Sequence, residues 1–116
     1  MTKNEWLAER VGFKRHPGLF GVWGYPDHHR ESFLPDFPNS LDAQVKWVWP
    51  EIKKCNSDNL LISFEQHGEE NVCAIEDWDV IEGEFIPIKD AYSGKTLAEA
   101  SFHACCAALG WADKED

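Results

Sequence analysis

Hydrophobic residues recur at helical spacing in the middle of the chain. Between residues 40 and 55 they form one stripe, at Leu41, Val45, Val48, Ile52 and Cys55. Ser40 precedes the stripe, and its hydroxyl can accept a hydrogen bond from the free N–H groups of the first turn. Pro50 lies inside the segment and would cost about 3 kcal/mol in a continuous helix. We therefore expect a helix over 40–55 with a kink or short break near residues 49–50.

A second helical pattern covers residues 96–110 and contains adjacent cysteines. Thr96 and Glu99 form a capping-box pattern, and Gly110 is a typical stop. The apolar stripe consists of Ala98, Ser101, Phe102, Cys105, Ala108 and Leu109. Cys105 lies in this stripe, Cys106 about 100° away on its flank and His103 on the outer side. Since neighbouring helical residues do not converge on one metal ion, we interpret Cys105 as a small apolar core residue.

Alternating patterns predict strands between the two helices. Residues 60–66 place Leu60, Ile62 and Phe64 on one face, and the return strand 72–78 places Cys73 and Ile75 on one face. Residues 84–89 predict a third strand, at an edge because Pro87 cannot donate to a ladder. Residues 90–95 are expected to form a loop. The predicted fold class is α+β: a three- to four-stranded antiparallel β-meander packed with two main helices.

The first 35 residues differ in character from the rest of the chain. Residues 4–11 predict a short helix capped by Asn4, and 19–25 one strand, within a Gly- and Pro-rich stretch. Aromatic side chains are expected to pack this stretch: Phe13, Phe20, Trp23, Tyr25, Phe33 and Phe37. We predict a single domain over 1–116, with an aromatic-rich N-terminal extension (1–35) wrapped around an α-β-α core (36–111) and an acidic tail (112–116).

Charge changes this picture because it is large and unevenly placed. The 116 residues carry a formal net charge of −10, and residues 65–84 contain eight carboxylates without Lys or Arg. We single out Glu69, Glu70, Asp77 and Asp79 as an acidic face, which is either only solvated or meets a basic partner or mimics nucleic acid. Direct binding of nucleic acid is not expected. With no apolar leader or membrane-spanning run, we expect a cytoplasmic protein with no membrane contact.

Candidate contact residues come from the aromatic and histidine-rich segments. Exposed Trp side chains and a charged loop favour ligand or partner contact, at Trp23, His28, His29, Arg30, Trp47 and Trp49. Adjacent histidines without a second ligand pair are a weak metal pattern, so we predict no metal and no cofactor. No catalytic motif is present, and no catalytic residue is assigned.

Three segments carry a resemblance to a known family. The stretch PDFPNSLDAQVKWVW, the strands, and then KTLAEASFHACCAALG are similar in order to small phage proteins with the phage ABA (α-β-α) sandwich domain, and WLAERVG resembles their openings. The chain departs from that pattern at Pro50 and in the acidic segment 76–90. The resemblance implies one α+β domain and an accessory role in an infected or lysogenic bacterium, and it brings no catalytic residues.

Three functional hypotheses follow from the charge pattern, the exposed aromatic residues and this resemblance. The first is a non-catalytic phage accessory protein that binds a host component, counteracting host defence by sequestering a nucleotide-like signal or by occupying a defence protein. The second is a structural module that forms a homo-oligomer; an acidic mimic of nucleic acid is a related alternative. The third is a small metal-dependent hydrolase built around His28, His29 and His103. We favour the first, with a host protein or nucleotide-like small molecule as partner and homo-oligomer formation as a companion expectation.

Overall fold

A computed structural model describes residues 2–27, 31–55, 60–88 and 91–111. The chain divides into two compact units, residues 1–36 and 37–116. The boundary lies between residues 36 and 37, one position from the predicted division after residue 35. The predicted acidic tail, 112–116, lies outside the described residues.

The first unit joins one short helix to a small sheet. Helix α1 (Lys3–Arg10) begins after Thr2, whose hydroxyl accepts from the Glu5 N–H while the Glu5 carboxylate accepts from the Thr2 N–H. The cap is therefore Thr2 and not Asn4, whose side chain donates to the carbonyl of Pro35 at 3.1 Å. Strands β1 (Lys14–Arg15), β2 (Trp23–Gly24) and β3 (Glu31–Ser32) form an antiparallel sheet in that order. The sequence predicted only the middle strand of this sheet.

Aromatic packing in the first unit is partial. Phe13, Trp23 and Tyr25 are buried, with Phe13 and Tyr25 in edge contact at 4.7 Å between ring centroids. Phe20 and Phe33, which we expected to pack with them, are exposed. Phe20 lies on the connection between β1 and β2, and Phe33 directly follows β3.

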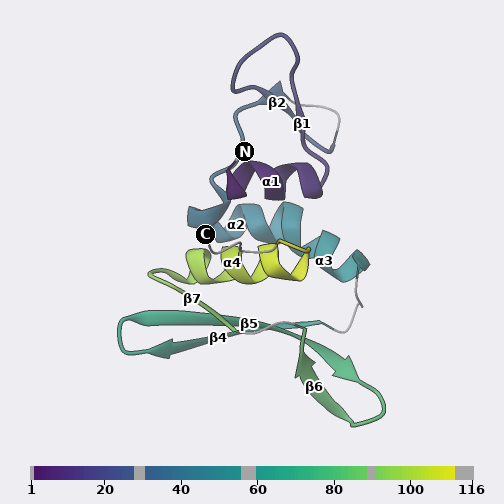
Figure 1. Ribbon diagram of the computed structural model, residues 1–116, viewed down its shortest axis with the longest axis vertical. Helices are drawn as coiled ribbons and strands as arrows, with labels where there is room; N and C mark the ends of the chain where they lie inside the picture. Colours follow the sequence, from purple (N-terminus) through teal and green to yellow (C-terminus); the bar gives the residue numbers. More distant parts are fainter. Residues whose placement is uncertain (1, 28–30, 56–59, 89–90, 112–116) are drawn as a thin grey trace. The chain divides into compact units, whose positions relative to one another are not determined.

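The second unit is built on a four-stranded antiparallel sheet (Figure 1). Strands β4 (Leu61–His67), β5 (Glu70–Asp79) and β6 (Glu84–Pro87) follow one another, and β7 (Tyr92–Gly94) pairs with β5. Strand β6 lies at an edge, as Pro87 predicted. Strand β7 falls in the predicted loop 90–95 and was missed. The α+β fold class is confirmed.

The two faces of this sheet differ in burial. Phe64 pairs with Cys73 and Ile62 with Ile75, and Cys73 and Ile75 are buried, so this inner face is the one that the alternation predicted. The helices of the unit lie on the inner side (Figure 1). We call the opposite side the open face; its side chains include Leu61, Ser63, Glu65, Val72, Ala74, Glu76, Trp78 and Phe85.

Helix α4 (Leu97–Ala108) is the centre of the unit. It packs against β5 and β7 on one side and against the helical segment before β4 on the other (Figure 1). Cys105 is buried as predicted, but Cys106 is also fully buried rather than on a flank, because α4 is covered from both sides. Of the predicted capping box, the bond from the Glu99 N–H to the Thr96 hydroxyl is formed at 3.1 Å. The Glu99 carboxylate instead lies 3.9 Å from His103 Nε2.

The helical segment after the 3-10 turn η1 (Phe37–Asn39) changes its winding before Pro50. It consists of α2 (Leu41–Ala43), a π-helical turn, η2 (Gln44–Val48), and α3 (Trp49–Cys55), and Ser40 caps it as predicted. The π-turn leads directly into α3, so the segment has no break at Pro50. It also rotates the apolar stripe: Val48 and Ile52 are buried, but Val45 is exposed and Gln44 takes its place in the core. The Gln44 amide donates to the carbonyls of Phe37 and Ala98, which ties η1 and α4 together.

Candidate binding surface

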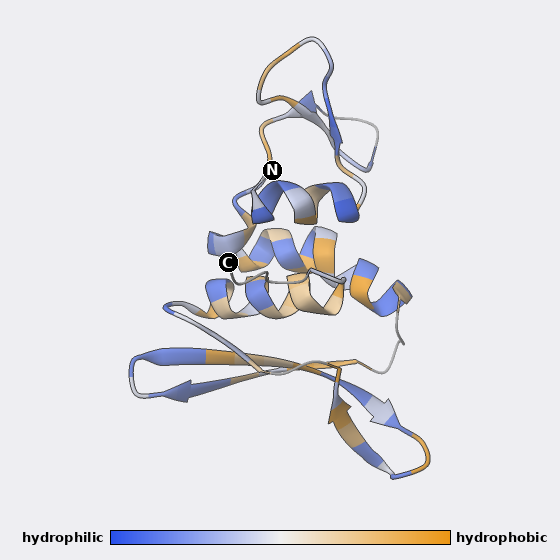
Figure 2. Cartoon of the chain, in the orientation of Figure 1, coloured by the Kyte–Doolittle hydropathy of each residue, from blue (hydrophilic) through white to orange (hydrophobic). Residues whose placement is uncertain are grey.

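A hairpin extends from the sheet at the end of β5. The first residue of β4, Leu61, pairs with Glu76 of β5. Beyond Glu76, as far as Asp79, β5 pairs only with β6 among the described strands. Because no third strand or helix covers this ribbon in the described part of the unit, its apolar side chains stay accessible. Figure 2 shows hydrophobic residues at the turn and along β6. We call residues 76–87 the acidic hairpin.

Apolar side chains project from this hairpin. Val80 is 86% exposed and Ile81 is 92% exposed at the turn. Trp78 and Phe85 face each other across the strands on the open face, with 5.1 Å between ring centroids, and each remains 40% exposed. Paired aromatic side chains with free surface are common at the centres of protein interfaces.

The turn itself is held by polar contacts that leave the apolar side chains outside. One Asp79 carboxylate oxygen accepts from the N–H groups of Ile81 (2.8 Å) and Glu82 (3.1 Å). The Gly83 N–H donates to the Asp79 carbonyl, and Gly83 has a φ of +69°, which favours glycine. Asp79 therefore shapes the turn that displays Val80 and Ile81.

Carboxylates are concentrated in the sheet segment that includes the apolar surface. Residues 60–88 contain no Lys or Arg and eight acidic residues: Glu65, Glu69, Glu70, Glu76, Asp77, Asp79, Glu82 and Glu84. On the open face, Glu76 accepts from the Ser63 hydroxyl at 3.2 Å. The sheet thus combines negative charge with exposed aromatic and aliphatic residues.

The four residues singled out as one acidic face occupy two places. Glu69 and Glu70 lie at the β4–β5 turn, beside Ser93, Lys95 and Glu99, where they line a shallow depression. Asp77 and Asp79 lie at the other end of β5, about 25–30 Å away at the usual strand rise. Asp77 places one carboxylate oxygen out of solvent with no hydrogen-bond partner among the described residues. Only the second pair belongs to the acidic hairpin.

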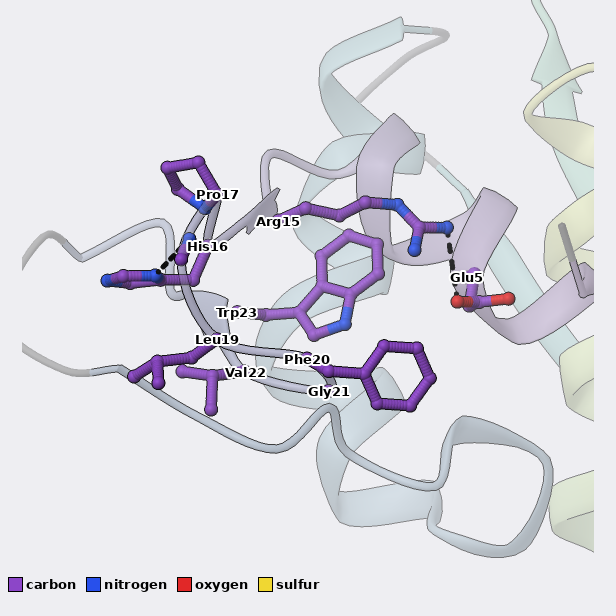
Figure 3. Close-up of a pocket in the computed structure, with 10 residues that line it drawn as sticks. Glu5, Arg15, His16, Pro17, Leu19, Phe20, Gly21, Val22 and Trp23 are labelled. Atoms are coloured by element: carbon purple, nitrogen blue, oxygen red, sulfur yellow. Dashed lines mark hydrogen bonds and ion pairs between the residues drawn. The ribbon is translucent and has the colours of Figure 1, made fainter.

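A pocket of about 310 Å³ lies in the first unit (Figure 3). The Arg15 guanidinium lies 4.7 Å from the centre of the Trp23 ring and is paired with Glu5 (3.1 Å) and Glu9 (3.4 Å). Hydrogen bonding to the Thr2 N–H, with Arg15 nearby, lowers the pKa of Glu5. Trp23 is only 3% exposed, and Phe20 is the exposed ring of the pocket. The arrangement offers neither an unpaired cation for a phosphate nor a free Trp23 face for a base.

Of the other predicted contact residues, the structure describes only Trp47 and Trp49. His28, His29 and Arg30 are outside the described residues. Trp47 is half-buried, and the Lys46 ammonium lies 4.8 Å from its ring centre. Trp49, expected to point away from the core, buries its indole N–H, which forms no hydrogen bond within the described part of the chain. The π-turn explains this difference, because it rotates the residues that follow it toward α4.

The cysteines form no reactive or metal-binding site among the described residues. All four are free. Burial raises the pKa of Cys105 to about 12 and that of Cys73 to about 11, while the Ser101 hydroxyl acts in the opposite direction on both. In the described ranges, no group of three or more His, Cys, Asp or Glu side chains is arranged to hold a metal ion. The buried thiols are therefore poor nucleophiles.

Sequence reasoning missed the apolar part of the surface. Trp78 and Phe85 were placed in predicted strands, Val80 and Ile81 were given no element, and none of the four was named as a contact residue. The signal lay in the letters WDVIEGEF, where two β-branched residues occupy a turn that usually takes polar ones. Hydrophobic residues at a turn with no predicted cover indicate an exposed patch.

Comparisons with protein-family models, with curated proteins and with solved structures find no match to this chain. Within the described ranges, no helix has both the length and the apolar character needed to cross a bilayer.

Proposed function

We propose that this protein is a non-catalytic binding protein that holds a basic protein partner on the acidic hairpin. The observation that carries the proposal is the exposure of Val80, Ile81, Trp78 and Phe85 on a ribbon bordered by carboxylates. Exposed apolar patches with a polar border are typical of interaction sites. The apolar residues would supply affinity, and the carboxylates would select the partner and speed its approach.

Charge favours a basic partner over a second copy of this chain. Residues 60–88 carry eight carboxylates and no Lys or Arg, so two copies that met through this surface would place like charges together. A partner surface with lysines or arginines around an apolar centre meets both features at once. The resemblance to small phage proteins supports a host protein as that partner and the bacterial cytoplasm as the place of action.

The experiment compares variants of the hairpin in their recovery of partners from a bacterial lysate. Val80→Ser/Ile81→Ser removes apolar surface, and Glu82→Gln/Glu84→Gln removes two charges. Asp36→Asn/Asp42→Asn is the matched control, because it changes the net charge equally at exposed positions elsewhere. We expect the wild type and the control to recover the same basic protein. Each hairpin variant should bind the purified protein at least about tenfold more weakly.

The proposal fails if every variant recovers the same proteins with the same affinity. It also fails if the wild type recovers only acidic proteins. Circular dichroism of each variant checks that the fold is retained.

A further inference from the structure

Strand β4 provides the longest unpaired edge of the sheet in the described part of the chain. It runs over Leu61–His67 and pairs with β5 along its whole length, while no described strand lies on its other side (Figure 1). The opposite side of β5 is occupied by both β6 and β7. The outer side of β4 is therefore the place where another strand could be added.

The hydrogen-bonding pattern identifies the backbone groups on this edge. The Ile88 N–H donates to the carbonyl of Ile75, so Ile75 directs its backbone groups away from β4. Ile62 is the β4 partner of Ile75, and the backbone direction alternates along an antiparallel pair. Ile62, Phe64 and Gln66 consequently direct their N–H and C=O groups to the outer edge. Ser63 and Glu65 direct theirs to β5.

This edge lacks the usual protection against strand addition. Protected edges carry lysines, a proline or a bulge. Strand β6 has Pro87, whereas β4 has neither Lys nor Pro, and its register with β5 is continuous from Leu61 to His67. Edges of this kind pair with extended peptides, with backbone bonds giving affinity and alternate side chains giving specificity.

We propose that β4 receives an extended segment rich in lysine or arginine as an added strand of the sheet. This inference rests on the proposed function, because it names how the basic partner is held. Every second side chain of the segment would lie on the open face, beside Glu65 and close to Glu76 and the exposed Leu61. A second copy of β4 would bring another Glu65 to this position and neither Lys nor Arg, while His67, the other titratable group on β4, already lies 2.9 Å from Glu65 Oε2 on its own strand. Charge complementarity therefore selects a basic occupant.

Hydrogen exchange on the wild-type protein tests the proposal directly. The probe is a nine-residue peptide of alternating lysine and valine with blocked ends. In the free protein, the amides of Ile62, Phe64 and Gln66 should exchange fast and those of Ser63 and Glu65 slowly. Saturation with the peptide should slow the three outer amides at least about tenfold and leave other exposed amides unchanged.

Variants separate strand addition from simple charge attraction. Gln66→Pro removes one outer N–H at an exposed position, and Gln66→Ala is its matched control. We expect Gln66→Pro to weaken peptide binding at least about fivefold and Gln66→Ala to leave it unchanged. Peptides methylated on the lysine amides or on the valine amides keep the charge and lose one hydrogen-bonding edge. At least one of these methylated peptides should bind the wild-type protein as weakly as the parent peptide binds the Gln66→Pro variant.

The outcomes distinguish this inference from the proposed function. Binding without protection of the three outer amides overturns strand addition, and so does the absence of binding at millimolar peptide. In either case the proposed function stands if the Val80→Ser/Ile81→Ser variant still loses the natural partner. Loss of both effects overturns both.

Discussion

At the scale of single residues, the ionisation of two buried thiols affects the stability of the second unit. Cys73 on the sheet and Cys105 on α4 are both buried and both interact with the hydroxyl of Ser101. In the folded protein their pKa values are raised to about 11 and about 12, above the ordinary thiol value of 9.0. Ionisation of either thiol is therefore coupled to unfolding.

This coupling predicts a loss of stability in alkaline solution. Below pH 9 the thiols are neutral in both the folded and the unfolded state, so their full contribution to the free energy of unfolding is present. Between pH 9 and 11, only the unfolded chain releases these protons, so the free energy of unfolding falls by up to about 1.4 kcal/mol per pH unit for each thiol. Urea unfolding from pH 8 to 10.5 measures the slope.

Variants at single cysteines provide the comparison. Cys105→Ala should reduce this alkaline slope, although it lowers stability at neutral pH. Cys55→Ala should leave the slope unchanged because Cys55 is exposed. Equal slopes in all three proteins would show that ionisation of the buried thiols is not coupled to unfolding.

At the scale of elements, β7 approaches α4 so closely at Gly94 that there is no room for a side chain. A Cβ atom at Gly94 would lie 2.6 Å from the Ala100 backbone nitrogen and 2.9 Å from the Glu99 Cβ. Gly94 also pairs with Asn71 of β5, so the strand cannot move away without breaking its register. The short strand therefore depends on the absence of a side chain at this position.

Gly94→Ala should destabilise the protein by about 1–3 kcal/mol, the usual cost of overpacking. The melting temperature measured by circular dichroism should fall by several degrees. Gly18→Ala is the control, because its Cβ would make only ordinary contacts, at 3.5 Å or more, with His16. A Gly94→Ala protein as stable as this control would mean that β7 and α4 can separate freely.

The same elements show what the sequence can predict. Strands β4 and β5 and helix α4 were predicted correctly because their apolar periods are set by burial on one element. Strand β7 has three residues, and pairing with β5 and packing on α4 determine it, so no local period indicates it. The π-turn is also invisible to a pattern that assumes 3.6 residues per turn, so that pattern placed Val45 in the core and did not identify Gln44 as a core residue. On the surface, the carboxylates were predicted, but the exposure of Trp78 and Val80 depends on where β4 begins, at Leu61 opposite Glu76.

For the whole molecule, net charge opposes association through the exposed apolar hairpin. The chain carries a formal charge of −10, and the hairpin carries five acidic residues: Glu76, Asp77, Asp79, Glu82 and Glu84. At low salt we expect repulsion between copies to keep the protein monomeric. At 1 M NaCl the screening length falls to about 3 Å, so the exposed Val80 and Ile81 should then promote self-association.

Sedimentation velocity at 20 mM and 1 M NaCl checks this expectation. The Val80→Ser/Ile81→Ser variant should remain monomeric at both concentrations. A stable oligomer of the wild type at low salt would contradict the repulsion argument and favour the structural homo-oligomer instead.

The central place of α4 has a consequence for synthesis of the chain. Translation delivers residues 61–94 before residues 97–108, so the sheet leaves the ribosome while its inner face still lacks the helix that covers it. The segment 41–55 also lacks its packing partner during this interval, because it packs on the other side of α4. At about 5–20 residues per second, this interval lasts on the order of seconds. During it, the nascent sheet exposes Ile75 and Cys73 together with the free edge of β4, which makes it a substrate for chaperones that hold apolar strands.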